Sequence, residues 1–147
     1  MITLKELGTD KSLLVVTHPQ CEYCKEYSKS EYCQNIPLTK KIILLPKEET
    51  FYEIESLKSI YKAKDPALYF QSIMKNEQYL DIDYDKDVTS LWNENIDMLQ
   101  KIEDKFAKVQ FTPTMFLLSK ENELLQEIVI NVDFSKLMHD EIVKLAK

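Results

Sequence analysis

The sequence predicts a mixed α/β fold for one domain over residues 1–147, and the order of its apolar segments is what predicts it. Residues 13–17 and 42–45 are short apolar runs of the kind that form buried strands, and a proline follows closely after each. From about residue 21 to residue 34 the chain suits a helix. A strand, a helix and a second strand in this order predict two parallel strands joined by a crossover helix.

The C-terminal part of the chain predicts two antiparallel strands and a helix. Residues 115–118 form an apolar run, and a polar turn over 120–123 separates this run from a second strand over 124–132. Apolar residues at helical spacing then predict a helix over 134–145. The two ends of the chain therefore predict a βαβ unit and a ββα unit that share one central mixed sheet.

Between these two units the chain predicts only helices. Apolar residues recur at helical spacing over 51–61 and again over 88–106, where they mark a long amphipathic helix. We expect Asp65 to be the N-cap and Pro66 the first residue of a further helix. An aspartate side chain accepts hydrogen bonds from the free N–H groups at a helix start, and proline loses no hydrogen bond at the first position, where the N–H has no partner within the helix. We therefore expect a helical insertion at about residues 50–108.

Charge and composition exclude several classes of function. The formal net charge is −6, and every cationic side chain is a lysine, so no guanidinium group is present to recognise phosphates or bases in a bidentate manner. The single glycine, Gly8, excludes the glycine-rich loops that bind nucleotides. We expect no nucleic-acid partner and no cofactor.

The sequence contains no apolar stretch of the roughly 18 residues that a membrane-spanning helix needs. Residues 1–6 also lack the basic and apolar regions of a signal peptide. We therefore expect either a cytoplasmic protein or an exported protein whose leader has been removed.

The motif Cys21-Glu22-Tyr23-Cys24 lies where the first predicted strand turns into the first predicted helix. A C-x-x-C motif in this βαβ setting is typical of a redox-active dithiol. The free N–H groups and the dipole at a helix N-terminus stabilise a thiolate, so we expect Cys21 to be the nucleophile. Cys24, one turn further along, would resolve the mixed disulfide.

Two other interpretations of the cysteines are weighed against this one. A structural zinc site could use His18, Cys21, Cys24 and Cys33, which is formally enough ligands for a tetrahedral site. Zinc sites usually take a second pair of ligands from a distant turn, so we favour the interpretation without a metal. An inert pair of core cysteines is disfavoured further, because Glu22 and its polar neighbours predict an exposed motif.

Three other residues are candidates for modulating the dithiol. His18 could polarise Cys21, although a solvent-facing histidine at the strand end is favoured. Glu26 is a candidate proton acceptor for Cys24. Cys33 is either a small buried apolar residue or an additional redox partner. Glu22 places a negative charge beside Cys21 and so opposes the helix dipole.

The segment 17–24 and the downstream run 111–114, Phe-Thr-Pro-Thr, together resemble the thioredoxin-fold disulfide oxidoreductases. In that family a cis-proline loop lies against the C-x-x-C motif, and Pro113 and the preceding Thr112 match its position. The resemblance implies that this loop offers backbone groups to an extended substrate strand. In thioredoxin itself a buried acid lies on the strand before the motif, and Val15 takes that place here.

Within this family the chain looks most like the catalytic domain of the bacterial periplasmic isomerases DsbC and DsbG. Tyr23 in the dipeptide, Thr112 before the proline and the segment 60–67 carry this likeness. Those proteins have an N-terminal dimerisation domain that is absent here, so we expect a monomer, and reduction or oxidation becomes as plausible as isomerisation. The resemblance favours a periplasmic location over a cytoplasmic one.

The function that follows is thiol–disulfide exchange on proteins, catalysed by Cys21 and Cys24. The implied partners are cysteine-containing polypeptides and a membrane-bound or soluble redox partner protein. The alternative is a non-catalytic module that uses the same fold to bind or chaperone extended polypeptides. The zinc module is a third hypothesis.

Overall fold

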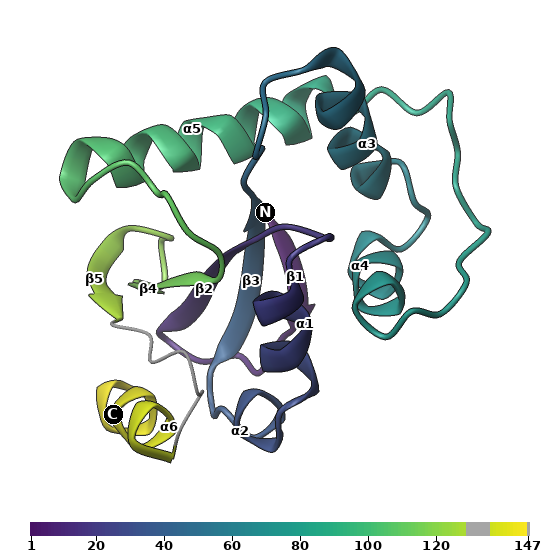
Figure 1. The fold of residues 1–147 in the computed structure, drawn as a ribbon. Coiled ribbons are helices and arrows are strands. Elements are labelled where there is room, and N and C mark those ends of the chain that lie inside the picture. Colours follow the sequence, from purple (N-terminus) through teal and green to yellow (C-terminus); the bar gives the residue numbers. More distant parts are fainter. Residues whose placement is uncertain (129–135, 147) are drawn as a thin grey trace.

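The computed structural model describes residues 1–128 and 136–146, and its centre is a five-stranded sheet (Figure 1). The strand order is β1-β3-β2-β4-β5. β2 and β3 are parallel, whereas the β1–β3, β2–β4 and β4–β5 pairs are antiparallel. The mixed sheet made of βαβ and ββα units is therefore as predicted. The strands are β1 (Ile2–Lys5), β2 (Ser12–Thr17), β3 (Thr39–Leu44), β4 (Thr114–Leu118) and β5 (Leu124–Ile128).

The edge strand β1 was not predicted from the sequence. It pairs with β3 and is only four residues long, with two of its side chains exposed. So short a segment, part exposed and part buried, has no clear alternating pattern, and its pairing depends on β3 rather than on its own propensity. The predicted second strand of the C-terminal hairpin is observed as β5 as far as Ile128, and the rest of it lies outside the described residues.

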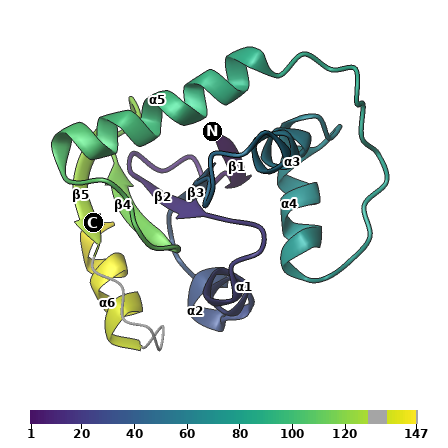
Figure 2. The same cartoon turned by 45° about the horizontal axis from the view of Figure 1, so that its top comes forward.

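Helices cover both faces of the sheet, as Figure 2 shows with α5 on one side and α1 and α2 on the other. Alternate residues of β2 point to opposite faces, so Leu13 and Val15 pack with α1, α3, α4 and α6, whereas Leu14 and Val16 pack with α5. Among the described residues, no helix is long and apolar enough to cross a membrane. The helices are α1 (Glu22–Lys29), α2 (Glu31–Gln34), α3 (Phe51–Tyr61), α4 (Pro66–Met74), α5 (Thr89–Lys105) and α6 (Lys136–Leu145).

The predicted insertion is observed as α3, α4 and α5, which follow one another between β3 and β4. Asp65 caps α4 by accepting a hydrogen bond from the Leu68 N–H at 3.1 Å, and Pro66 is the first residue of that helix, as predicted. Phe51 is the first apolar residue of the helical pattern over 51–61, from which we predict a buried side chain, and it is instead exposed in the first turn of α3.

The single helix expected after Cys21 is two helices in the structure. Ser30 has an extended backbone conformation between α1 and α2. Its hydroxyl accepts a hydrogen bond from the Cys33 N–H at 3.1 Å and so acts as the N-cap of α2. A serine within a predicted helix interrupts it here because its side chain offers the backbone an alternative partner.

Candidate active site

Cys21 is held at the junction of β2 and α1 by two hydrogen bonds to backbone groups. Its own N–H donates to the His18 carbonyl at 3.1 Å, which closes a tight turn after β2. Its Sγ accepts a hydrogen bond from the Cys24 N–H at 3.2 Å, so Cys21 is the N-cap residue of α1. The sulfur therefore lies at the N-terminus of a helix, where unpaired N–H groups gather.

The loop before β4 covers Cys21 from the other half of the fold. The Cys21 thiol contacts the Thr112 carbonyl oxygen at 3.3 Å, although 91 positions separate the two residues. The Thr112–Pro113 peptide bond is cis. Because β4 pairs with β2 in a register that places Thr114 opposite Val16, the residues just before β4 lie beside the turn that carries Cys21.

Cys24 lies deeper than the exposed residues around it. Burial raises its pKa to about 11, and the neighbouring Cys21 adds to this, against smaller opposing effects of Thr17, His18 and Thr112. Cys24 therefore stays protonated at neutral pH.

The expectation of an exposed cysteine pair is wrong, because Cys21 is 5% exposed and Cys24 is 3% exposed. The exposure falls on the dipeptide between them: Tyr23 is 53% exposed, and Glu22 is an exposed residue that pairs with Lys25 at 3.8 Å. Polar residues in the first turn of a helix predict that one face is exposed. They do not determine whether the cysteines in the same turn are buried. Here the Thr112 loop covers the sulfur of Cys21.

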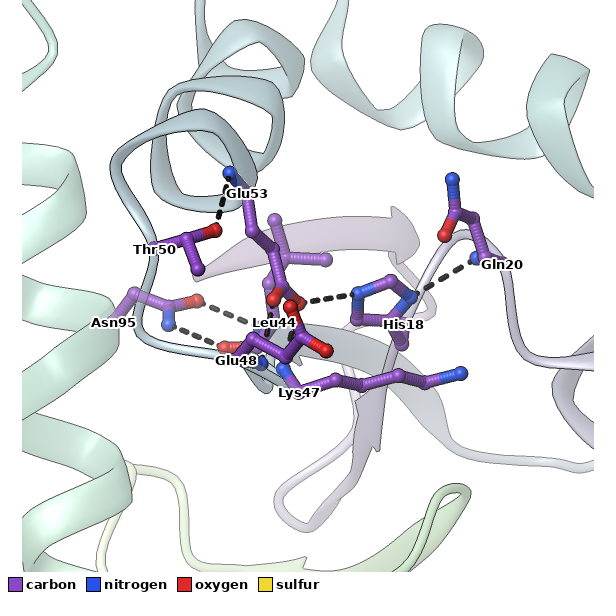
Figure 3. A network of polar contacts seen from close by, with 8 residues as sticks. All are labelled: His18, Gln20, Leu44, Lys47, Glu48, Thr50, Glu53 and Asn95. Carbon is purple, nitrogen blue, oxygen red and sulfur yellow. Dashed lines mark hydrogen bonds and ion pairs between the residues drawn. The ribbon is translucent and has the colours of Figure 1, made fainter.

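His18 is not the solvent-facing residue that the sequence favours. It is 3% exposed, its Nε2 lies 2.9 Å from a Glu53 carboxylate oxygen, and its Nδ1 accepts a hydrogen bond from the Gln20 N–H at 3.1 Å (Figure 3). Burial lowers the pKa of His18, although Glu53 opposes the shift. The ring faces α3, and its backbone carbonyl rather than its ring contacts Cys21.

Glu53 is a site residue that the sequence reasoning missed. Its carboxylate accepts hydrogen bonds from the Lys47 and Glu48 N–H groups at 2.6 and 2.5 Å, in addition to His18. Partial burial alone would raise the pKa of Glu53, but these donors outweigh it and hold the pKa below its ordinary value. The pattern Thr50-x-x-Glu53 at the start of a helix is a capping-box signal that could have drawn attention to this residue.

Glu26 and Cys33 are not brought to the dithiol by hydrogen bonds. Glu26 is exposed on α1, two residues beyond the buried Cys24 and so on another side of the helix. Cys33 is buried in α2, where its Sγ lies 3.7 Å from the Lys40 Nζ. Within the described part of the chain, no three histidine, cysteine or acidic side chains are grouped to hold a metal ion. The zinc hypothesis therefore has no geometric support.

Comparisons with known proteins find similarity at the level of the fold. No protein-family model matches the chain, and a search of curated proteins finds no match. BdbD from Bacillus subtilis, in its oxidised form, matches 98% of this chain and 91% of its own, with a TM-score of 0.57 and 8% identity. A disulfide interchange protein from Neisseria gonorrhoeae matches 97% of this chain and 94% of its own, with a TM-score of 0.55 and 14% identity. The expected thioredoxin-like fold is confirmed.

Proposed function

We propose that the protein catalyses thiol–disulfide exchange on polypeptides through Cys21 and Cys24. One observation carries the proposal: the Cys21 sulfur lies at the N-terminus of α1, receives the Cys24 N–H, and contacts the Thr112 carbonyl of the cis-proline loop. This arrangement places a nucleophilic sulfur beside a resolving thiol and beside backbone groups that a substrate strand can use. The structural neighbours support this proposal, since one of them is a disulfide interchange protein.

The reaction takes place in two exchange steps. The Cys21 thiolate attacks one sulfur of a substrate disulfide and forms a mixed disulfide, while the other substrate sulfur leaves as a thiolate. Cys24 then gives up its proton and attacks the Cys21 sulfur, so the second substrate sulfur leaves and a Cys21–Cys24 disulfide remains. The substrate gains two electrons, which the enzyme loses. The same steps in reverse oxidise substrate thiols.

The exposed aromatic residues at the site support a polypeptide substrate. Tyr23, two residues after Cys21, is 53% exposed. Phe111, directly before Thr112, is 77% exposed. Apolar side chains left in solvent beside backbone donors and acceptors suit an extended polypeptide with a cysteine and apolar neighbours. We further propose, from the resemblance to DsbC and DsbG, a reductase or isomerase of the periplasm that a redox partner protein regenerates.

Trapping of the mixed disulfide tests this function. Incubated with a disulfide-bonded peptide, the Cys24→Ser variant should accumulate a covalent adduct on Cys21, because the resolving thiol is gone. The Cys33→Ser variant is the matched control and should turn over like the wild type. If the Cys24→Ser variant forms no adduct, and no Cys21–Cys24 disulfide forms in the wild type, the exchange function is wrong.

The burial of both sulfurs favours one alternative, a non-catalytic module that binds polypeptides at the same surface. The Cys21→Ala variant separates the two functions, because it removes exchange and leaves the binding surface in place. Peptide affinity that is unchanged in Cys21→Ala, together with no exchange in the wild type, would support the alternative.

A further inference from the structure

The turn that carries Cys21 depends on the ring of His18 in one protonation state. The Gln20 N–H donates to Nδ1 at 3.1 Å, so Nδ1 carries no proton. The ring proton of the neutral imidazole is therefore on Nε2, which faces the Glu53 carboxylate at 2.9 Å. Two residues further along, the Cys21 N–H donates to the carbonyl of the same histidine at 3.1 Å.

Glu53 is fixed independently of this ring. Its carboxylate holds the Lys47 and Glu48 N–H groups, and its own N–H donates to the Thr50 hydroxyl at 3.3 Å (Figure 3). The acceptor for Nε2 is therefore built into the first turn of α3. As a result, the inserted helices and the turn of the dithiol are joined through one histidine.

Few charges face the ring, which lies in the turn after β2 and contacts the first turn of α3. Glu53 from α3 favours the imidazolium, and Lys47 from the segment between β3 and α3 disfavours it. Burial is the larger effect and also disfavours the imidazolium. The thiol of Cys24 lies by the backbone of His18 rather than by its ring.

We propose that His18 is a positioning residue whose protonation releases the Cys21 turn, so that the thiol–disulfide exchange proposed above is switched off by acid. A proton on Nδ1 would face the Gln20 N–H, donor against donor, and this hydrogen bond would be lost. The turn from His18 to Cys21 would then open, and the Cys21 sulfur would leave its place between the Cys24 N–H and the Thr112 carbonyl. The proposal rests on the proposed function for its consequence but not for its geometry.

Two substitutions each preserve one of the two hydrogen bonds that the His18 ring makes. In His18→Asn the side-chain oxygen can take the place of Nδ1 and accept the Gln20 N–H, but the residue cannot titrate. In His18→Gln the amide can take the place of Nε2 and donate to Glu53, but the acceptor for Gln20 is lost. Glu53→Gln keeps a carbonyl oxygen for Nε2 and removes the charge that favours the imidazolium. His139, the other histidine of the chain, supplies the control His139→Asn.

The experiment measures the rate of Cys21 alkylation by iodoacetamide on the reduced full chain between pH 4 and pH 8, with mass spectrometry to locate the label. In the wild type and in His139→Asn, the pH dependence of the rate should steepen by up to about 10-fold per pH unit once His18 is protonated, because one further proton then has to leave. In His18→Asn the pH dependence of the rate should show no such steepening, which we call the break. Glu53→Gln should move the break to lower pH, and His18→Gln should react slowly at every pH.

Nuclear magnetic resonance of the His18 ring in the wild type keeps the test independent of whether the variants fold. The ring should carry its proton on Nε2, and it should titrate at the pH of the break. A ring that titrates without any change in the Cys21 rate, or a break that persists in His18→Asn, overturns the proposal. Failure of the exchange function would look different: no Cys21–Cys24 disulfide would form, while the alkylation break would remain.

Discussion

At the scale of single residues, Cys21 and Cys24 are both buried but differ in the hydrogen bonds around the sulfur. The Cys21 sulfur receives an N–H at the start of α1, whereas burial raises the pKa of Cys24 to about 11. We therefore expect alkylation of the reduced protein at pH 8 to label Cys21 well before Cys24. The labelling rate of Cys24, followed by mass spectrometry, should continue to rise up to about pH 11. Equal labelling of the two cysteines at pH 8 would contradict this assignment.

Glu22 is the charged residue that directly follows Cys21 in the sequence. A negative charge at this position of the helix start opposes a thiolate on Cys21, although the pair with Lys25 and the exposure of Glu22 weaken the effect. We expect Glu22→His to raise the reduction potential, measured in glutathione buffers, by about 30 mV or more, which is a tenfold change in the equilibrium constant. Glu26→His, one turn along the exposed face of α1, is the control and should leave the potential unchanged. Equal potentials in both variants and in the wild type would rule out this role of Glu22.

The cysteines and the proline loop could be proposed from the sequence because motif spacing and position carry that information. A C-x-x-C between a strand and a helix, and a proline before a later strand, are local patterns. The pair of His18 and Glu53 could not be proposed in this way, since 35 positions separate the two side chains and only the fold brings the first turn of α3 to the turn after β2. The burial of Cys21 likewise depends on a loop from the other half of the chain.

At the scale of secondary-structure elements, Asn95 attaches α5 to the sheet. It is fully buried, accepts the Leu44 N–H and the Tyr61 hydroxyl at 2.8 Å each, and donates to the Leu44 carbonyl at 2.8 Å. β1 begins at Ile2 opposite Ile42, so Leu44 lies beyond the end of that pairing, and Asn95 takes the place of a neighbouring strand.

Asn95→Ala should therefore leave buried backbone groups of β3 without partners. Each such group costs about 1–3 kcal/mol, so we expect the free energy of unfolding to fall by about 3 kcal/mol. Urea denaturation measures this loss, and Asn93→Ala, at an exposed position of the same helix, should change the free energy by less than about 0.5 kcal/mol. A similar loss in both variants would contradict this role of Asn95, because replacing asparagine by alanine raises helix propensity and so cannot by itself cause a loss.

Elements with strong local signals were predicted well, and elements defined by their neighbours were not. α4 begins at the capping residue and the proline that predict it. The strand β1 and the break at Ser30 were missed, because β1 is held by its pairing with β3 and a single serine is compatible with a continuous helix. Asn95, a polar residue on the buried side of an amphipathic helix, was a visible exception to the apolar pattern that the sequence reasoning left unexplained.

At the scale of the whole molecule, α3 connects three parts of the fold. Its first turn holds the segment after β3 through Glu53 and the turn after β2 through His18. Its buried residues Leu57, Ile60 and Tyr61 belong to the same core as Cys21 and Cys24. The insertion is therefore part of the support of the dithiol, and its stability and the geometry of the site are coupled.

This coupling predicts how the stability of the whole protein depends on pH. The pKa of His18 is lowered from 6.5 on folding, so the unfolded chain binds more protons, and stability is lost as the pH falls below about 6.5. The pKa of Glu53 is also lowered, so its contribution is present above about 4.5 and is lost as the pH falls below that value. We expect the free energy of unfolding of the reduced protein to decline in two stages as the pH falls, the first of them before most carboxylates titrate.

Urea denaturation of the reduced protein between pH 4.5 and pH 8 isolates the first stage, because the second begins only below about pH 4.5. In His18→Asn the first stage should disappear, even though the variant is less stable overall because it no longer bonds to Glu53, whereas His139→Asn should keep the wild-type slope. The slope, rather than the absolute stability, is the decisive quantity, because it counts the protons taken up on unfolding. An identical slope in the wild type and in His18→Asn would show that the buried histidine does not couple protonation to the fold.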